Sequence, residues 1–536
     1  VKRRNSMEER EFHLCREPWI YVMEQDYQVK EVTLIDALVN ADKYRGLAGE
    51  TETQNIAIIR FLLAVLHTVF SRQNEKGEQV PIDTKEEALR RWGAMWEMGC
   101  FPRKLIEEYF SQWEDRFWLF DYKYPFYQVP GIEGTQYPAK KMNGLIVEGS
   151  DKNKKKKIQL FSMREGNKKE LLNYDEAARW IIYLQAFGDT ATKKPTPKLC
   201  WVGSLGIVVA KGNSLFETLM MNLTLLKDGK EIWGEAKPVW EKNSPSSEKL
   251  KEIPIPDNQP ELLSLQCRRV LLIREHGNVT GYIEAAGEYI NKESAFSEQM
   301  TYWTVRKTGK GGEEYVPHIH EKSRQMWREF STLMGDKGRK PGIISWISKL
   351  QSCGIVSKDR YISVQIIGIE YGTKTCGVVD EFSDALQFHV SILNELGRKL
   401  QKRITDEVEH CNSLAKLVKQ LAVSLDKATG GDGKSASMKA MEQAYYRLDI
   451  PFRQWLLHLD PEQNLEWQNI YFKEWRRTAK KIIIDLGQEL VDQVGTAAIS
   501  GRIVKEKLKN REVERHYSAP EAFNYFLYEI KKEVGV

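Results

Sequence analysis

The spacing of apolar residues divides the chain into two parts of different character. Over roughly the first two thirds, stretches with apolar residues three or four positions apart alternate with β-branched runs typical of strands. We expect helices at 33–38, with Thr33 as N-cap, and at 53–71, 175–187 and 215–226. We expect strands at 269–273, 361–369 and 376–379. This mixture predicts an α+β domain.

The pattern changes after Asp380. Apolar residues recur at steps of three and four from Leu386 to Leu425, which predicts one long amphipathic helix that ends at the turn 430–433. Further helical stretches are expected at about 435–458, 461–494 and 501–534, with a break near Pro520. Four helices with one apolar face each can bury those faces only against one another. The predicted fold is therefore α+β, with a large mixed domain (1–380) followed by a four-helix bundle (381–536).

Composition limits the kind of protein. A chain of 536 residues exceeds what one hydrophobic core usually organises, which agrees with more than one domain. The formal net charge is only +5, too low for a protein that coats nucleic acid with its whole surface. Any contact with nucleic acid should therefore be local, through patches and loops.

The cysteines and the longest apolar run indicate the compartment. The seven cysteines contain no C-x-x-C pair, which argues against a disulfide framework and a structural zinc site. The run from Ile56 to Phe70 is interrupted by Arg60 and His67 and is too short to span a bilayer, and we see no N-terminal signal pattern. We expect a cytoplasmic protein with no membrane partner.

A cluster of aromatic residues is followed by a lysine-rich stretch. Seven aromatics lie between Phe117 and Pro130. The lysines that follow are Lys140, Lys141, Lys154, Lys155, Lys156 and Lys157. Aromatic side chains either pack in a core or stack on bases, and a lysine-rich loop either neutralises phosphates or is a solvated surface. The composition of the stretch leaves both interpretations open.

Three motifs raise the alternative of an enzyme. The segment 428–435 (ATGGDGKS) fits a permissive phosphate-loop pattern, but it joins two predicted helices and not a strand to a helix. The segment 308–312 (TGKGG) is better explained as a hairpin turn. His318 and His320 could ligate a metal, yet no third ligand stands at a recognisable spacing. We therefore expect no catalytic residues, metal or cofactor, and keep a nucleotide- or metal-dependent nucleic-acid enzyme as the alternative.

Several ordered segments together resemble one known family. They are EFHLCREPWIYV at 11–22, the stretch 31–70, FDYKYPFYQVP at 120–130, YDEAARWIIYLQAF at 174–187, AKGNSLFETLMMNL at 210–223, PVWE at 238–241, LLSLQCRRVLLI at 262–273, QMTYW at 299–303 and SRQMWRE at 323–329. In this order and spacing they resemble the large subunit of the type I-E CRISPR surveillance complex Cascade, the CasA family. The resemblance extends over nearly the whole chain.

The resemblance implies a non-catalytic subunit that reads DNA. Members of the family recognise the protospacer-adjacent motif (PAM) on double-stranded DNA, insert a wedge that starts strand separation, and recruit a helicase-nuclease. The expected partners are the backbone and small subunits of Cascade, the guide RNA, double-stranded target DNA and the helicase-nuclease. Pairing with the guide RNA reads the target sequence, so the protein has to read only the short motif beside it.

The resemblance also suggests DNA-binding residues in the mixed domain. The basic loop 131–157 corresponds to a loop near the guide RNA and the PAM. The family's glycine-rich reading loop falls just before Trp201, where this chain has no glycine run. The candidates there are Lys193, Lys194 and Lys198, with Lys292 as the counterpart of a groove-inserting lysine. The wedge corresponds to the hairpin turn Tyr371, Gly372, Thr373 and Lys374.

Cations on the predicted bundle are the last candidates. Arg398 and Lys402 lie on adjacent turns of one helix, and Arg476 and Lys480 on adjacent turns of another. Such clusters suit a displaced single strand and the neighbouring small subunits. A solvated helix face explains them equally well, and a purely architectural helical subunit remains a further alternative.

Overall fold

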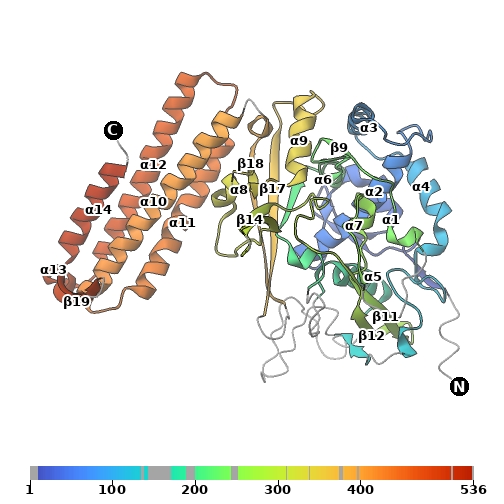
Figure 1. Cartoon of the computed structure of the whole chain (residues 1–536), viewed down its shortest axis with the longest axis horizontal. Helices are drawn as coiled ribbons and strands as arrows, with labels where there is room; N and C mark the ends of the chain where they lie inside the picture. Colours follow the sequence, from blue (N-terminus) through green and yellow to red (C-terminus); the bar gives the residue numbers. More distant parts are fainter. Residues whose placement is uncertain are drawn as a thin grey trace. The chain divides into compact units, whose positions relative to one another are not determined.

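The computed structural model describes residues 10–134, 138–142, 171–188, 199–242, 251–309, 311–336, 338–372, 378–394, 397–508 and 511–533. The chain divides into two compact units. Unit 1 comprises 1–322, 335–357 and 362–385, and unit 2 comprises 323–334, 358–361 and 386–536. Figure 1 labels many of the helices and strands of both units.

Unit 1 combines helices with many short strands. Its helices are α1 (Leu34–Val39), α2 (Glu52–Arg72), α3 (Lys85–Met98), α4 (Arg103–Gln112), α5 (Tyr174–Phe187), α6 (Leu215–Asn222), α7 (Gln259–Leu263) and α9 (Gly342–Ser352). Its strands are β1 (Glu11–His13), β2 (Ile20–Glu24), β3 (Val29–Val32), β4 (Tyr44–Leu47), β5 (Trp118–Phe120), β6 (Lys140–Lys141), β7 (Ile207–Lys211), β8 (Leu226–Lys227), β9 (Glu231–Ile232), β10 (Lys251–Glu252), β11 (Arg268–Glu275), β12 (Asn278–Ala286), β13 (Glu288–Tyr289), β14 (Trp303–Lys307), β15 (Glu313–Pro317), β16 (Gly338–Arg339) and β17 (Tyr361–Tyr371). Strand β18 (Val378–His389) begins in unit 1 and its last residues belong to unit 2.

The strands form several small sheets. Two of them position the candidate site, with strand orders β18-β17-β7 and β11-β12-β6. In the first, β17 pairs antiparallel with β7, with Val364 opposite Ala210. In the second, β11 and β12 form a long antiparallel hairpin, and β6 adds Lys140 opposite Tyr282. The antiparallel β14–β15 hairpin confirms the turn predicted at 308–312.

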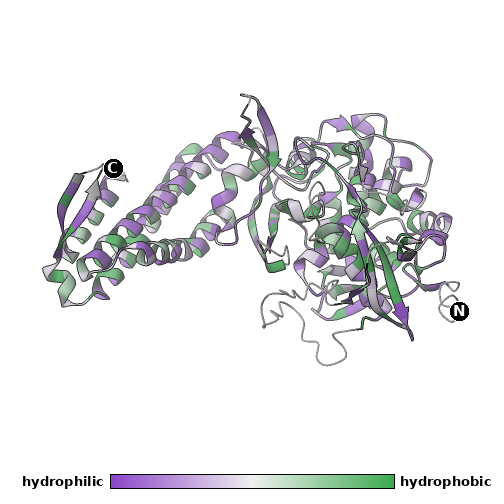
Figure 2. Ribbon diagram, turned by 60° about the horizontal axis from the view of Figure 1, so that its bottom comes forward, coloured by the Kyte–Doolittle hydropathy of each residue, from purple (hydrophilic) through white to green (hydrophobic). Residues whose placement is uncertain are grey.

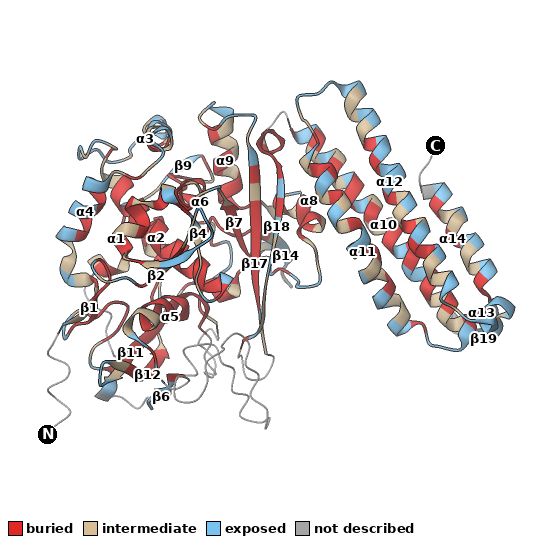
Figure 3. Ribbon diagram, turned by 180° about the vertical axis from the view of Figure 1, so that it is seen from behind, coloured by how far each residue is buried: buried red, intermediate tan, exposed pale blue. Residues whose placement is uncertain are grey.

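Helix α2 is the core of unit 1. It confirms the helix predicted at 53–71, and Thr51 caps it by accepting a hydrogen bond from the Gln54 N–H. Every residue from Thr53 to Phe70 is buried, as the unbroken red of α2 in Figure 3 shows. The prediction that this run is too short to span a bilayer was wrong, because the helix has 21 residues. Within the described chain it is the one helix long and apolar enough to cross a membrane, but it lies wholly inside the unit, as core helices do.

The aromatic residues between Phe117 and Pro130 belong mostly to this core. Phe126 and Tyr127 pack with Phe61 of α2 at ring-centroid distances of 5.5 and 6.2 Å, and Phe117 is fully buried. Edge-to-face contacts of this kind add to the free energy gained by burying the rings. The buried rings cannot stack on bases, and only Tyr122 of the segment is largely exposed, at 65%.

Unit 2 is built on long helices. They are α10 (Arg398–Thr429), α11 (Lys434–Leu457), α12 (Leu465–Asp492) and α14 (Ala519–Glu533), with the shorter α8 (Phe330–Leu333) and α13 (Thr496–Ser500). The long helices carry green apolar stripes and purple polar stripes in Figure 2, as amphipathic helices of a bundle do. Buried residues of α10 such as Leu414, Val418 and Leu421 follow the predicted spacing. The predicted fold class, a mixed domain followed by a helical bundle, is confirmed.

Two predictions about unit 2 were wrong. The first bundle helix begins at Arg398 and not near Leu386, because 378–389 pair with β17 as strand β18. The predicted helix at 501–534 is an antiparallel hairpin of β19 (Arg502–Leu508) and β20 (Arg511–Tyr517), followed by α14. Positive φ at Gly501, where a Cβ would lie 2.3 Å from the Tyr517 carbonyl oxygen, turns the chain into this hairpin.

A buried ion pair joins α2 to the segment 298–300. The Arg60 guanidinium donates two hydrogen bonds, of 2.9 and 2.8 Å, to the Glu298 carboxylate, and both side chains are almost fully buried. The Trp201 indole N–H and the Met300 backbone N–H donate to the same carboxylate. Burial alone would raise the pKa of Glu298, but Arg60 and Trp201 outweigh it, so the pKa is lowered.

We predict that Glu298→Gln destabilises the protein by about 3–5 kcal/mol, because it leaves the Arg60 charge buried without a counter-charge. Chemical denaturation measures the change. The control is Glu489→Gln, which removes half of the exposed Arg447–Glu489 pair and should cost at most about 1 kcal/mol. Since the folded-state pKa of Glu298 is lowered, its contribution to the free energy of unfolding is complete above the unfolded-state pKa of about 4.3. This contribution is lost as pH falls through the lower folded-state pKa. Equal costs for the two variants would contradict the prediction.

Candidate nucleic-acid interface

The two ends of the predicted reading loop are joined to each other. Helix α5 ends at Phe187, and the Gly188 carbonyl accepts hydrogen bonds of 2.9 Å from the Cys200 N–H and from the buried Arg268 guanidinium. A Cβ on Gly188 would lie 2.4 Å from the Leu184 carbonyl oxygen, so this position after α5 requires glycine. Residues 189–198, including Lys193, Lys194 and Lys198, lie outside the described residues. Gly188 and Cys200, which lie on either side of that segment, are therefore held together.

The end of β17 lies against the same point. The Tyr371 hydroxyl donates a 2.8 Å hydrogen bond to the Phe187 carbonyl, the last residue of α5. The hydroxyl also fills the space above Gly203, where a Cβ would lie 2.3 Å from it. Gly372 is half-buried, and Thr373 and Lys374 lie outside the described residues. The base of the predicted wedge is thus hydrogen-bonded to the base of the predicted reading loop.

A cavity of about 640 Å³ opens beside the loop base. Its lining includes Leu199 and Trp201, which follow the loop, and Lys292, the predicted groove-inserting lysine. Lys292 is exposed, whereas Trp201 is buried and held by its hydrogen bond to Glu298. Glu252 and Glu288 also line the cavity, so its charge is mixed. The structure therefore brings Lys292 to the same cavity as the residues that follow the loop.

The described part of the basic loop is tied to the β11–β12 hairpin. Lys140 lies 2.5 Å from the buried Glu284 carboxylate, which also pairs with Arg268, and its ammonium group lies over the Tyr282 ring. Lys141 is exposed. Lys154, Lys155, Lys156 and Lys157 lie outside the described residues. Lys140 therefore has a structural partner, and Glu284 connects it to Arg268 at the base of the reading loop.

The cations of the bundle have different surroundings. Arg398 and Lys402 are exposed on α10, and Lys480 is half-buried on α12. Arg476 instead donates to the buried Glu407 carboxylate of α10, at 2.7–3.1 Å. This ion pair holds α12 against α10. Arg476 is exposed as well, but its charge is already paired with Glu407.

The motifs behind the enzyme alternative take ordinary structural positions. The segment 428–435 joins α10 to α11, with Gly430 and Gly433 at positive φ, and it lacks the strand that a phosphate loop follows. His320 is buried, its Nε2 lies 3.1 Å from the Ile207 carbonyl oxygen, and burial lowers the pKa of His320 to about 3. Among the described residues, no group of three or more His, Cys, Asp or Glu side chains could hold a metal ion.

The sequence did not single out Arg268 or Gly188, although both hold the loop base. A pair of arginines within the β-branched run 268–273 was the available signal, because a charged side chain in a buried strand needs a partner. Its partners, the carbonyl of Gly188 and the carboxylate of Glu284, come from distant parts of the chain. Spacing alone could not identify them.

This mixed α+β unit with small sheets around a buried helix, continued by a helical bundle, is a fold that solved structures of CRISPR-associated proteins share. A family model described as CRISPR-associated protein Cse1 matches residues 13–486. The chain therefore belongs to the Cse1 family.

Three relatives illustrate this similarity. The chain is 28% identical over 233 residues to CRISPR-associated protein CasA/Cse1 of Thermus thermophilus, which is 41% of this chain and 42% of that protein. This match thus spans less than half of the relative. The crystal structure of Thermobifida fusca Cse1 superposes with a TM-score of 0.80 at 25% identity, over 98% of both chains. A chain of a structure described as a CRISPR RNA-guided surveillance complex has the same fold, with a TM-score of 0.64 at 15% identity over 90% of this chain and all of the other.

We predict that Tyr371→Phe loosens the loop base. Without the hydrogen bond to the Phe187 carbonyl, the free energy that keeps the loop base closed falls by about 0.5–1.5 kcal/mol. Amide exchange at Cys200 should therefore become roughly 2- to 10-fold faster. Hydrogen–deuterium exchange with mass spectrometry measures the exchange rate of this amide. The matched control is Tyr361→Phe, at the exposed start of the same strand. Unchanged protection of the Cys200 amide in Tyr371→Phe would show that the hydroxyl does not hold the loop.

Proposed function

We propose that this chain is the non-catalytic large subunit of a type I-E CRISPR RNA-guided complex in the cytoplasm. In this proposal it recognises the PAM on double-stranded DNA, starts strand separation and recruits the helicase-nuclease. Its partners are the backbone and small subunits, the guide RNA and the target DNA. Unit 1 acts as the DNA-reading domain and unit 2 as the bundle that supports the opened strands.

The observation that carries the proposal is the meeting of three features at one place in a member of the Cse1 family. The ends of segment 189–198 meet at Gly188, Tyr371 binds the last residue of α5, and Lys292 lines the adjoining cavity. A loop and a hairpin that share one rigid base can enter neighbouring parts of a groove together. That the loop and the hairpin enter a groove of the DNA is the proposed part.

In this proposal the guide RNA reads the target and the protein reads only the PAM, so a weakly basic protein is enough for DNA recognition. Guide pairing supplies the sequence specificity and most of the contact with the target strand, so the protein needs only a few cations near the PAM. Reading in the minor groove requires few side chains, because the pattern of hydrogen-bonding groups there is degenerate. A net charge of +5 over 536 residues is compatible with such local contact.

The wedge is proposed to be the hairpin turn of Tyr371, Gly372, Thr373 and Lys374, between β17 and β18. Unstacking one base step costs roughly a few kcal/mol, which pairing with the guide recovers. Tyr371 is the last residue of the paired strand β17, and its hydroxyl binds the Phe187 carbonyl. In this proposal, these contacts connect the wedge to the core of unit 1.

We predict that the complex assembled without this chain loses its discrimination among flanking motifs. Filter binding or gel shift with duplexes that differ only in the PAM measures the ratio of affinities. Adding the chain back should restore discrimination by about 10-fold or more, since each specified base pair is worth about 1–3 kcal/mol. Duplexes that already have an open target region serve as the control. Undiminished discrimination without the chain would refute the proposal.

We predict that replacing Lys154, Lys155, Lys156 and Lys157 by Ala weakens DNA binding without changing the PAM preference. If all four ammonium groups contact phosphates, the slope of log K against log salt should become shallower by about 3.6. Titrations at several salt concentrations measure the slope. The control is Lys104→Ala on α4, whose side chain is 84% exposed and pairs with Glu108. An unchanged slope would assign the lysines to a solvated loop.

A further inference from the structure

Two buried cysteines meet at the loop base. Cys200 closely follows segment 189–198, Cys267 precedes β11, and both are free thiols, 1% and 4% exposed. The Cys267 sulfur accepts a 3.4 Å hydrogen bond from the N–H of Trp201, the residue next to Cys200. The Cys200 thiol lies within hydrogen-bonding reach of that sulfur and, at 3.2 Å, of the Leu184 carbonyl. The two cysteine side chains are therefore in contact.

The backbone on both sides of this contact is fixed. The Cys200 N–H donates to the Gly188 carbonyl at 2.9 Å. The Cys267 carbonyl accepts from the Gly287 N–H at 3.0 Å and from the Arg268 guanidinium at 2.9 Å. A disulfide needs such proximity, because its two Cα atoms lie only about 4.4–6.8 Å apart. The fold therefore holds these two thiols close enough to react with each other.

The two thiols differ in how readily they ionise. The hydrogen bond from the Cys200 thiol outweighs burial and lowers the pKa of Cys267, and the Trp201 N–H acts in the same direction. Burial instead raises the pKa of Cys200 well above its ordinary value. Peroxides react with the thiolate form, and redox-sensing cysteines usually have a second, resolving cysteine beside them. We therefore expect Cys267 to be oxidised first and Cys200 to be its resolving partner.

The cavity of about 640 Å³ at the loop base offers an oxidant a route to this pair. Cys267 is one of the residues that line the cavity, and Cys200 is not. A water molecule takes up about 30 Å³ in the liquid, so hydrogen peroxide, with two oxygen atoms, is small enough to enter. An oxidant inside the cavity therefore reaches Cys267 before Cys200.

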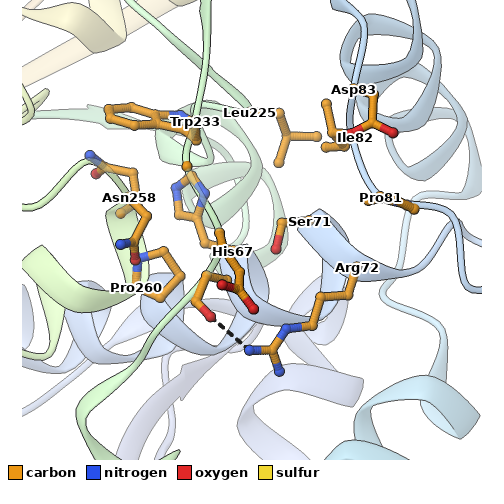
Figure 4. A pocket seen from close by; sticks show the side chains of 14 residues that line it. His67, Ser71, Arg72, Pro81, Ile82, Asp83, Leu225, Trp233, Asn258 and Pro260 are labelled. Atoms are coloured by element: carbon orange, nitrogen blue, oxygen red, sulfur yellow. Dashed lines mark hydrogen bonds between the residues drawn. The ribbon is translucent and has the colours of Figure 1, made fainter.

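The second cavity of unit 1 has no comparable chemistry. It has a volume of about 250 Å³ and lies at the end of α2, where Figure 4 shows the side chains that line it. None of the described residues on its lining is a cysteine. Arg72 on its wall donates to the Ala236 carbonyl, along the dashed line in Figure 4, and to the Glu241 carboxylate. The thiol pair thus belongs to the loop base and not to the cavities of unit 1 in general.

We propose that Cys200 and Cys267 form a reversible redox site that responds to hydrogen peroxide. The Cys267 thiolate attacks one peroxide oxygen, which gives a sulfenic acid and releases hydroxide. The Cys200 sulfur then attacks the Cys267 sulfur, so that the disulfide forms and the sulfenic oxygen leaves as water with the Cys200 proton. In balance, two thiols and one peroxide give one disulfide and two waters, and exchange with a dithiol reverses the reaction.

The disulfide joins the chain just after segment 189–198 to the start of β11. It removes the open conformations in which these two parts separate, so it tightens the loop base. Reversible disulfides of this kind are the usual ones in cytoplasmic proteins, where a structural framework of disulfides is rare. The site uses none of the residues proposed to contact DNA. It therefore goes beyond the proposed function, and either proposal can fail without the other.

The test is peptide mapping by mass spectrometry, without reduction, of the full chain after treatment with hydrogen peroxide. We expect a cross-linked pair of peptides that contains Cys200 and Cys267, and its loss after dithiothreitol is added. The exposed Cys353 is the reference thiol that sets the dose of peroxide. The buried thiols Cys15 and Cys411 should stay reduced, because burial raises their pKa.

Two variants assign the roles of the pair. In Cys200→Ser, oxidation of Cys267 should stop at the sulfenic acid, which dimedone traps. In Cys267→Ser, Cys200 should stay reduced at the same dose of peroxide. The control Cys353→Ser removes an exposed thiol and should leave the yield of the cross-link unchanged. The cross-link in the unaltered chain decides the question even if a variant does not fold.

Hydrogen–deuterium exchange measures the effect on the loop base. The Cys200 amide should exchange several-fold more slowly in the oxidised chain than in the reduced chain. Recovery of Cys200 and Cys267 as reduced thiols at a dose that fully oxidises Cys353 would overturn the proposal. A cross-link that forms only in urea, a main product that joins either residue to another cysteine, or equal exchange in both chains would overturn it as well.

Discussion

The ion pair between Arg60 and Glu298 is the interaction on which the arrangement of unit 1 depends. It places a charge in the middle of a helix whose residues from Thr53 to Phe70 are all buried, and a second buried charge compensates it. Glu298 in turn receives the Met300 N–H, and the Met300 carbonyl accepts from the Val208 N–H of β7. Since β7 pairs with β17, hydrogen bonds lead without a break from the core helix to the hairpin strand.

The same carboxylate holds the candidate interface. Trp201 donates to Glu298 and lies three residues after the end of the segment 189–198, so the chain is fixed to the core close to that end. The other end is fixed through Gly188, whose carbonyl binds both Cys200 and Arg268. A loop with both ends fixed loses less conformational entropy on binding than one with free ends. If segment 189–198 binds DNA as proposed, its two fixed ends lower the conformational entropy that this binding costs.

The sequence predicted the periodic elements well and the long-range contacts poorly. Helix α2 and the strand β17 follow from apolar residues that recur over a long stretch of sequence. The hairpin 502–517 was mistaken for a helix because charged residues dominate both of its strands, so neither period stands out. Leu386 fits the spacing of the following helix by chance, while its backbone belongs to β18. Pairing between strands is decided by distant residues, which a local pattern does not contain.

The candidate cations differ in what it would cost them to bind DNA. If Arg476 turned toward a phosphate, the Glu407 carboxylate would remain buried without its partner, at a cost of about 3–5 kcal/mol. Lys140 is restrained in the same way by Glu284, whose side chain is 2% exposed. Arg398 and Lys402 are exposed, and among the described residues no buried carboxylate would lose its partner if they turned toward a phosphate. Contact between the bundle and a displaced strand should therefore depend on the start of α10 more than on α12, where the arginine serves to hold the helices together.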